Sequence, residues 1–480
     1  MRFASLVGLA ALLAAPAAWS QALTAPSVGT GLSGVATADA AAVYWNPALL
    51  GYLERPTILV GGSLIVGDVS YERQRRATYQ RTDALGFALP VAPENIDPSR
   101  TGTAAAVTAN PVGVAPTLFA ALPIEIPGPT RLVAAVGLYA PYAAILAFDP
   151  DGPQRWQLQS ATIATVFATA SLAWRLNEKF SIGAGASYVF GFAELARVQD
   201  FAALGDVGAA LARPPISQRN DFGPNAPPGV RELDVLARPI RLRRMIAHGF
   251  TFNAGLAVRP VRGLQIGLSY QHMTDLTFAG RFELDLDDPF FTRDLASQGL
   301  QFAPRVEGDA TLSFPLPRAV RLGVAYDLTA RLGVTVVGEY VTWSQVERFD
   351  ARVRSPQLAQ PMLGLPDTTS LSLPRRWRDT FAVEGTARFA ASERLLLWVT
   401  GGYRSGASPD ETLDVASPDG DRIVAGAGLR VAVNDAWWLY GDVEVQTILP
   451  RTVVGSDLDL GNGTYRLTLV NLGAHVQRRF

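Results

Sequence analysis

Three histidines and no cysteines limit the chemistry that this 480-residue chain could perform. Without cysteine there is no thiol nucleophile, disulfide or cysteine metal ligand. His248, His272 and His475 accompany no G-x-S-x-G motif, no metal-spaced cluster and no phosphate-binding glycine loop. A lipid hydrolase would need a serine, a histidine and an orienting group at one point. The sequence therefore favours a protein that is not an enzyme and holds no metal or cofactor.

The arginines offer anion recognition in place of catalysis. Arg241, Arg243 and Arg244 form a cluster, and Arg197 lies ahead of them in the chain. Guanidinium forks suit both carboxylates and phosphates, and both interpretations stay open. Asp442 and Glu444 are expected to be solvated partners of arginines. Overall, 42 Lys and Arg against 43 Asp and Glu give no field that would attract nucleic acid.

The first residues predict export. Arg2, an apolar run over 6–15 and small residues over 18–22 are typical of a signal peptide covering residues 1–22, cleaved after Ser20 or Ala22. The apolar run is too short to span a membrane as a helix. The whole chain is 48% hydrophobic and 18% charged, and the region after residue 22 has no continuous apolar stretch of membrane-spanning length. A closed β-barrel is the way such an exported chain can satisfy its backbone in lipid.

Alternation with period 2 supports the barrel. In "FSIGAGASYVF" (180–190) one face is apolar and the other is mostly Gly and Ser, which fits a lipid face and a crowded lumen. About fourteen antiparallel strands are expected, at 57–71, 113–122, 131–142, 157–176, 179–195, 242–258, 263–282, 318–328, 332–350, 377–389, 394–404, 421–433, 436–448 and 465–480. Short and long connections alternate, as in outer-membrane barrels with periplasmic turns and external loops. The last strand ends in Phe480, which resembles the signal read by barrel-assembly machinery.

Ordered motifs resemble one family. "GTGLSGVATADAAAVYWNPALL", "GLYAPYAAILAF", "LAWRLNEKFSIGAGASYVFG", "EYVTWSQV" and "PDGDRIVAGAGLRV" follow the order seen in the FadL/TodX transporters of the Gram-negative outer membrane. The resemblance implies an all-β transmembrane barrel over 57–480, with an N-terminal hatch over 23–56 inside it. It also implies a lateral opening at a kink in the third strand.

The resemblance assigns roles to two short segments. The turn Asn46, Pro47 and Ala48 is expected at the tip of the hatch, against the kinked strand; a turn that merely starts the barrel is the alternative. The kink is expected at Pro141, Tyr142 and Ala143, where the alanine replaces a glycine usual in the family. Asp200 stands near the place where a fatty acid carrier would have a basic residue, so a neutral ligand stays open.

Two loops are expected to capture ligand between apolar walls, or else to pack over the barrel mouth. The capture residues are Phe201, Leu204, Leu211, Phe290, Phe291, Leu300 and Phe302. The implied function is passive uptake of long-chain fatty acids or related lipids, with aromatic hydrocarbon uptake as the alternative and a general porin or structural barrel as a weaker one. The expected partners are hydrophobic small molecules, outer-membrane lipid, lipopolysaccharide and the assembly machinery, for a monomer in the outer membrane.

Overall fold

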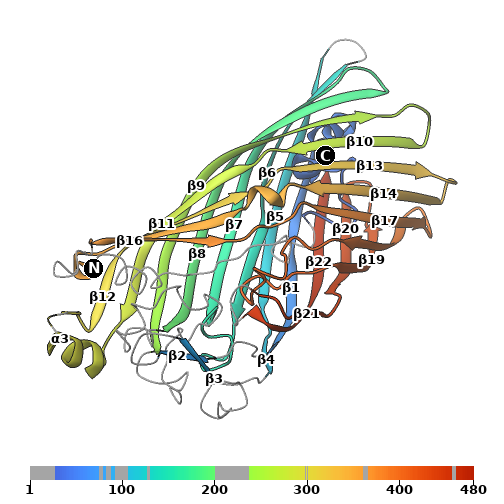
Figure 1. Cartoon of the computed structure of the whole chain (residues 1–480). Coiled ribbons are helices and arrows are strands. Elements are labelled where there is room, and N and C mark those ends of the chain that lie inside the picture. The colour runs from blue at the N-terminus through green and yellow to red at the C-terminus, as the bar shows by residue number, and fades with distance from the viewer. Residues whose placement is uncertain are drawn as a thin grey trace.

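The computed structural model describes residues 28–74, 79–82, 88–91, 106–126, 130–200, 237–297, 299, 301–359, 366–456 and 461–480. Within these ranges, twenty strand segments form one antiparallel sheet (Figure 1). They are β1 (Thr57–Arg73), β4 (Ala106–Ala109), β5 (Val112–Glu125), β6 (Arg131–Ala147), β7 (Ser160–Arg175), β8 (Phe180–Asp200), β9 (Ala237–Val258), β10 (Leu264–Gln271), β11 (Thr274–Asp285), β12 (Arg305–Leu316), β13 (Ala319–Asp327), β14 (Leu332–Val341), β15 (Arg348–Arg354), β16 (Thr368–Pro374), β17 (Thr380–Ala390), β18 (Leu395–Arg404), β19 (Arg422–Ala432), β20 (Trp437–Ile448), β21 (Arg451–Val453) and β22 (Gly463–Arg479). A separate hairpin pairs β2 (Tyr79–Thr82) with β3 (Ala88–Val91).

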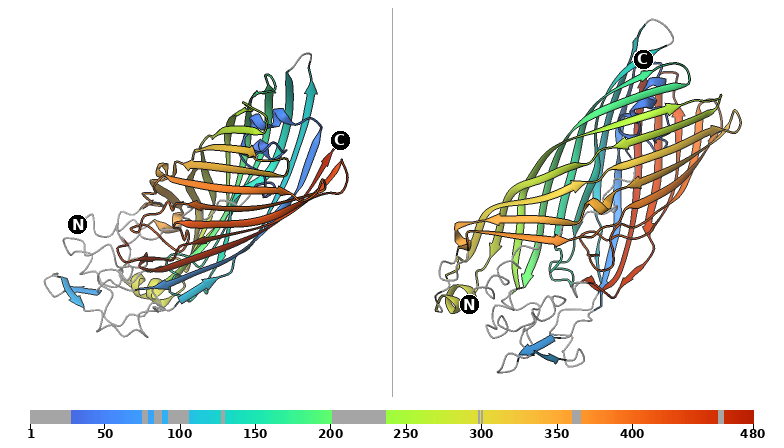
Figure 2. Two further views of the ribbon diagram at one scale, coloured as in Figure 1. Left: turned by 90° about the vertical axis from the view of Figure 1, so that its right-hand side faces the viewer. Right: turned by 45° about the horizontal axis from the view of Figure 1, so that its top comes forward.

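The sheet closes into a barrel because its first and last strands pair. β1 pairs with β22 from Thr57↔Arg479 to Arg73↔Gly463, and with β5 on its other edge. Several segments lie end to end and share one strand position, as β10 does with β11 and β12 with β13, so the barrel has fourteen strands. The views in Figure 2 show the strands enclosing a lumen. The expected fourteen-stranded antiparallel barrel is confirmed. In the described part of the chain, no helix is long and apolar enough to cross a membrane.

Strands extend further toward the long-loop end than the sequence predicts. β8 runs to Asp200 and β9 starts at Ala237, inside the segment 196–241 that was expected to be a loop. Likewise β12 occupies most of the expected loop 283–317. The prediction stopped these strands where charged residues begin, but the inner face of β12 stays apolar and buried beyond that point.

The wall consists of two zones with opposite facing. On β13, Val320, Leu322 and Val324 are exposed while Arg321 is buried, as expected for lipid outside and polar groups inside. On β12 the pattern is reversed: Leu312 and Phe314 are buried, and charged residues such as Asp309 face out. We call β11, β12 and β15, which share this reversed pattern, the outer extension. A polar outer face shows that these strands stand above the hydrocarbon layer.

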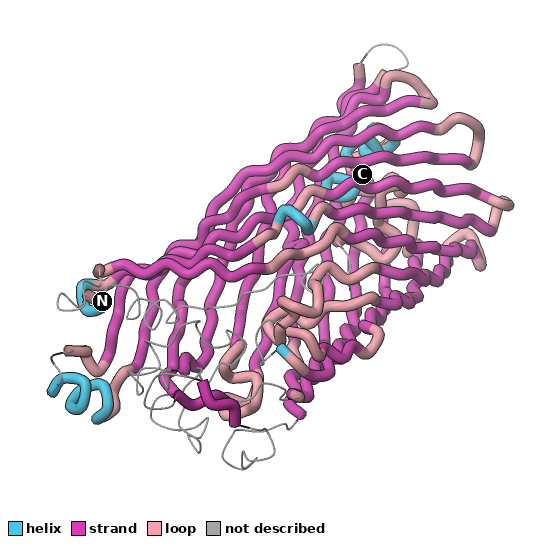
Figure 3. Tube along the Cα trace, viewed as in Figure 1, coloured by secondary structure: helices cyan, strands magenta, loops and turns pink. Residues whose placement is uncertain are grey.

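Breaks in the strands separate the two zones. β10 ends at Gln271 and β11 begins at Thr274, and β12 ends at Leu316 just before β13 begins at Ala319. Between β14 and β15 the break is the 3-10 helix η9 (Trp343–Gln345), which interrupts the wall in Figure 3. A single-residue slip reverses which side of a strand faces inward, and these breaks supply it.

Residues 28–56, called here the hatch segment, precede the barrel and contact its inner face (Figure 2). They contain the short helix α2 (Ala42–Trp45) and the 3-10 helix η3 (Pro47–Tyr52). Asn46 caps η3, because its side chain accepts a hydrogen bond from the Ala48 amide at 3.1 Å, and Pro47 supplies a fixed φ at the first position. Small side chains before the cap let this turn lie close to the wall.

Candidate functional site

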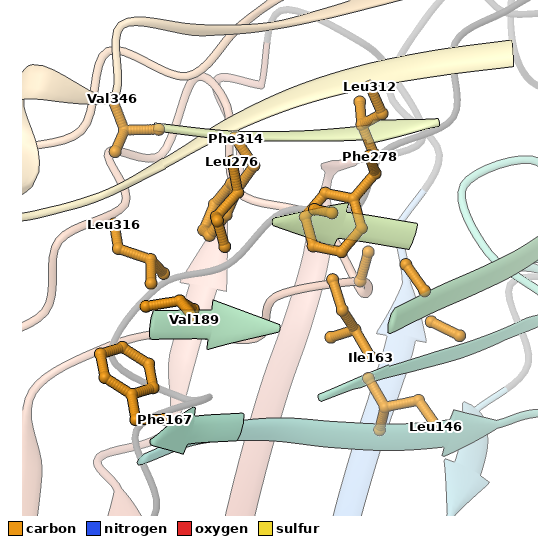
Figure 4. Close-up of a cluster of buried hydrophobic side chains, with 14 of the residues drawn as sticks. Leu146, Ile163, Phe167, Val189, Leu276, Phe278, Leu312, Phe314, Leu316 and Val346 are labelled. Carbon is orange, nitrogen blue, oxygen red and sulfur yellow. The ribbon is translucent and has the colours of Figure 1, made fainter. Parts of the chain in front are cut away.

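The barrel interior above the hatch segment is apolar, not polar as in a water-filled porin. Side chains from β6, β7 and β8 face side chains from β11 and β12, all of them buried (Figure 4). This inner apolar cluster comprises Leu146, Ile163, Phe167, Val189, Leu276, Phe278, Leu312, Phe314, Leu316 and Val346. Each such side chain contributes roughly 1.5–3 kcal/mol when it is buried against an apolar surface. The cluster can therefore hold a hydrophobic molecule by burial alone.

In the described part of the chain, side chains fill the interior where β7, β8 and β9 reach the long-loop end. A cavity of only about 10 Å³ lies at its outer end, beside Leu158, Leu195 and Leu242. That is roughly the space of one water molecule. The Gln157 side chain also accepts a hydrogen bond from the backbone amide of Val415 at 2.9 Å, joining two loops that are far apart in sequence. A ligand can enter only if side chains or loops move.

Strand β6 carries an irregularity at the expected kink. Its pairing with β7 shifts between Tyr139 and Tyr142, so that one extra residue is inserted at Ala140–Pro141. Such a bulge bends a strand and reverses its facing. Ala143, which replaces the family's usual glycine, pairs regularly with Ala164. The bulge therefore forms without a glycine, next to a proline that cannot donate to the ladder.

The same place marks the end of pairing between β5 and β6. The ladder runs from Glu125↔Arg131 to Thr117↔Tyr139. Beyond it, residues 142–147 are paired on the β7 side, whereas β5 continues along β1. Within the described strands, the wall thus loses its backbone hydrogen bonds between β5 and β6 just above Tyr139.

Aromatic rings connect this interruption to the interior and to the hatch segment. The Tyr139 ring stacks on Phe167 of the inner apolar cluster at 5.7 Å and on Phe119 of β5 at 5.5 Å. On the side of the hatch segment, the ring of Tyr44 of α2 meets the Tyr139 ring edge-on, with 5.2 Å between the ring centroids. The Tyr139 hydroxyl has Thr169 Oγ1 as its hydrogen-bond partner at 2.8 Å, which fixes the ring. Tyr139 is therefore the meeting point of interior, wall and hatch segment.

The turn Asn46-Pro47-Ala48 is hydrogen-bonded to strands β8 and β9. Asn46 Nδ2 donates to the carbonyl oxygens of Val35 at 3.1 Å and of Leu256, on β9, at 3.2 Å. Ser181 Oγ of β8 donates to the Ala48 carbonyl at 2.6 Å. Both η3, which begins at Pro47, and α2 contact β6, and near the bulge this contact is made by Tyr44 with Tyr139.

Glycines on the wall make this seat possible. A Cβ on Gly255 would lie 1.9 Å from Asn46 Oδ1, and one on Gly183 would lie 2.5 Å from the Pro47 carbonyl carbon. Only glycine allows so close an approach of the hatch segment to the strands.

A buried ion pair holds the opposite side of the hatch segment. Arg321 of β13 pairs with Glu339 of β14 at 2.5 Å and donates to the Tyr44 hydroxyl at 3.2 Å. Asp442 accepts a hydrogen bond from the Gly31 amide at 3.1 Å. Asp442 was expected to pair with arginines in solvent, but it binds the hatch backbone; Glu444 accepts from Gln446 Nε2 at 2.8 Å.

The expected anion residues divide into two groups. Arg197 faces inward, buried, and donates to the Trp156 carbonyl at 3.0 Å and to Gln199, so it holds the loop after β6. Arg241, Arg243 and Arg244 lie on β9 and are exposed. Arg197 therefore does not join the other three in one anion site, because the facing of β8 turns it inward.

The expected capture residues are only partly described. Phe291 is fully buried and meets the half-buried Phe302 edge-on at 6.1 Å. Phe291 thus packs into the loop interior and is not part of an open wall. Phe201, Leu204, Leu211 and Leu300 lie outside the described residues, as does the side chain of Phe290, so their role stays a prediction.

The sequence reasoning missed the inner apolar cluster. The signal was present as the strict alternation in "EGDATLSFPL" (307–316), whose polar positions carry two acids. A lipid-facing strand would not carry these charges, so the charged face had to be the outer one above the membrane. Because every apolar face was interpreted as lipid-facing, the inward apolar face of this strand was not predicted.

Comparison with known proteins agrees with the geometry. A family model described as "Outer membrane protein transport protein (OMPP1/FadL/TodX)" matches residues 7–453. The chain belongs to this family. Members of the FadL/TodX family are transport channels for hydrophobic compounds, and this FadL/TodX protein is an outer-membrane protein.

Individual relatives of this FadL/TodX protein are distant. It is 22% identical over 404 residues to the "Long-chain fatty acid transport protein" of Escherichia coli O6:H1, covering 83% of this chain and 78% of the relative. A FadL homologue of Pseudomonas aeruginosa shares the fold with a TM-score of 0.71 at 18% identity, over 95% of this chain and 99% of that one. The Ralstonia pickettii toluene transporter TbuX gives 0.59 at 17%, over 94% and 97%.

Proposed function

We propose that this protein carries long-chain fatty acids or related lipids passively across the lipopolysaccharide layer and releases them sideways into the membrane. The single observation that carries the proposal is the inner apolar cluster, which leads through Phe167 to Tyr139 where the β5–β6 ladder ends. An apolar interior has no use in a porin, whose lumen is filled with water. Capture by the external loops, transfer to the cluster and exit beside Tyr139 form the proposed route.

Flux follows the concentration gradient along this route. A ligand that displaces several apolar side chains binds at micromolar strength, about −8 kcal/mol, and still dissociates. The hatch segment acts as the plug: its α2 contact with Tyr139 couples hatch position to the exit. No chemical step or energy source is needed.

Aromatic hydrocarbon uptake is the second candidate. The stacked rings of Phe119, Tyr139 and Phe167 favour it, because planar ligands pack well between aromatic faces. The engagement of Arg197 with the Trp156 carbonyl also leaves that arginine less suited to a carboxylate.

The test is uptake of labelled oleate, and separately of toluene, by Gram-negative cells that lack their own transporter and express this chain. Phe278→Asn places an amide in the inner apolar cluster and is expected to reduce uptake at least about fivefold, since burying an unpaired amide costs roughly 1–3 kcal/mol. Thr277→Asn, on the exposed outer face next to it, is the matched control and should transport normally.

Each outcome has one reading. Oleate uptake that depends on Phe278 supports the lipid function, and toluene uptake alone supports the second candidate. Uptake of neither compound by a folded barrel, or equal transport by the two variants, contradicts the proposed route.

A further inference from the structure

A second β-bulge lies on the outer surface of the wall, at the arginine cluster. The pairing of β8 with β9 shifts between Ala193 and Leu195, where β9 inserts one extra residue at Arg243–Arg244. Arg244 has φ of 51°, a left-handed conformation that glycine adopts far more easily. At the bulge the side chains of Arg243 and Arg244 are both exposed on the outer surface. Arg241 is exposed on the same face. A residue with a large charged side chain at a position suited to glycine points to a use for that charge.

The bulge stands at the outer boundary of the hydrocarbon layer. Along β9 the exposed side chains from Leu256 through Phe252 and Phe250 to Ile246 are apolar except for His248, whose ring packs among aromatic neighbours. That stretch of strand is about 33 Å long, or about 25 Å along the membrane normal at the usual tilt of roughly 40°, which matches the apolar band of such barrels. The arginines follow directly after Ile246. They are therefore at the depth of the lipid headgroups of the outer leaflet.

Aromatic side chains form a shelf just below the arginines. Phe250 is 77% exposed, and its ring contacts Tyr188 of β8 at 5.5 Å. The Tyr188 hydroxyl and His248 Nδ1 share a hydrogen bond of 2.5 Å, and Phe190 packs against the His248 ring at 5.7 Å. This aromatic shelf offers a firm apolar surface for acyl chains.

The charge balance at the bulge leaves positive groups available. Arg243 pairs with Glu283 of β11 at 3.2 Å, and Glu194 accepts a hydrogen bond from the backbone amide of Arg244 at 3.4 Å. In the described part of the chain, the guanidinium groups of Arg241 and Arg244 have no carboxylate partner. All three arginines border a hollow of about 380 Å³, together with Ser160 and Glu194.

We propose that this surface binds the phosphorylated headgroup of an outer-leaflet glycolipid of the lipid A type. Arg241 and Arg244 bind a phosphate through their guanidinium groups, and Arg243 lies beside them. The acyl chains lie on the aromatic shelf. Arginine suits this ligand because its planar fork meets phosphate oxygens in pairs. The site is on the outer face of β8 and β9, whereas the proposed exit is between β5 and β6, so it does not depend on the transport route. It fixes the barrel's depth and orientation in the leaflet.

The test is calorimetric titration of the purified, delipidated full-length barrel in detergent with bisphosphorylated lipid A. Arg241→Gln combined with Arg244→Gly should lower the affinity about tenfold or more, since two charged hydrogen-bond donors are lost. Arg244→Gly retains the bulge, because glycine accepts its φ, and so separates the charge from the backbone. Arg352→Gln, an exposed arginine of β15, is the matched control and should bind like the parent protein.

The proposal is overturned if the double variant keeps the parent's affinity while its heat-modifiable gel mobility shows a folded barrel. Free inorganic phosphate should not displace the lipid; displacement would reveal a simple anion site in place of a lipid site. Phe250→Ser should weaken binding of lipid A and leave binding of its deacylated form unchanged, and equal effects on both ligands would disprove the role of the shelf.

Discussion

At the scale of single residues, the fit between hatch segment and wall depends on the absence of side chains. Gly183 and Gly255 allow backbone and amide groups of the Asn46-Pro47-Ala48 turn to approach the strands, and polar bonds from Ser181 and Asn46 then fix the distance. Each such bond contributes about 1 kcal/mol net. These bonds together therefore stabilise the position of the segment on the wall by a few kcal/mol at most.

Gly255→Ala is expected to unseat the turn, since the new Cβ would collide with Asn46 Oδ1. Overpacking of this kind costs roughly 1–3 kcal/mol, so amide hydrogen exchange over residues 42–52 should accelerate and oleate uptake should change. Gly338→Ala is the matched control, because no atom lies within 4 Å of the added Cβ. Identical exchange in the two variants would show that the close approach does not matter.

Asp39 in the hatch segment gives a pH dependence. Burial raises the pKa of Asp39 to about 6 from 3.8, although its carboxylate accepts a hydrogen bond from Ser33 Oγ at 2.6 Å. A raised pKa means that the folded segment prefers the protonated acid. Its stabilising contribution is complete below about pH 4 and is lost as the pH rises through 6.

Hydrogen exchange over residues 40–52, corrected for the intrinsic rate, should therefore show more protection at pH 5 than at pH 7. Asp39→Asn should remove this dependence, because the amide does not titrate. A variant that keeps the parent's pH profile would assign the effect to another group.

At the scale of elements, short interruptions decide what each strand does. The bulge at Ala140–Pro141 ends the β5–β6 ladder, and the breaks before β11 and β15 reverse which face looks inward. In each case one residue of register changes the environment of every side chain that follows. Antiparallel strands of the same kind thereby form a lipid-facing belt, an apolar interior and an unpaired stretch of wall between β5 and β6.

Deletion of Ala140 is expected to restore regular pairing and close the gap. Residues 143–147 are apolar on both faces, so their reversal is tolerated in lipid and in the interior, and the barrel should still assemble. Uptake of the transported compound should then fall to about the level of cells without the protein. Pro141→Ala keeps the extra residue and serves as the control, with uptake retained; normal uptake by the deletion variant would place the exit elsewhere.

At the scale of the whole molecule, the barrel is obstructed from both ends. The hatch segment lies on the inner face toward the short turns, and loops joined by Gln157 and Val415 meet toward the long-loop end. Between them lies the inner apolar cluster, with a cavity of about 10 Å³ at its outer end. On the proposed route, this arrangement is expected to pass molecules that displace apolar side chains and to resist the free flow of water and ions.

Planar bilayers containing the purified protein should accordingly show no steady single-channel conductance. Deletion of residues 28–52 should produce open-channel current, because it removes the segment that contacts the inner face while β1 and the barrel closure remain. Large conductance of the intact chain would instead favour the general porin.

The barrel class, the fourteen strands and the position of the strand-three irregularity could be predicted from the sequence, because alternation, turn residues and family motifs are local along the chain. The candidate site could not. Alternation defines the two faces of a strand. Which face meets lipid depends on how deep the strand lies in the membrane and on single-residue shifts of register. The inward facing of Phe278 and Phe314 could therefore not be predicted.

The same limit applies to partners in space. Local sequence indicated that Asn46 begins a rigid turn, yet only the tertiary structure placed that turn on Gly183 and Gly255. Arg197 and Arg241 were both predicted as anion contacts from their residue type and loop positions, and the facing of β8 and β9 puts them on opposite sides of the wall. Backbone periodicity is a property of neighbours in sequence, whereas inside and outside exist only once the sheet has closed.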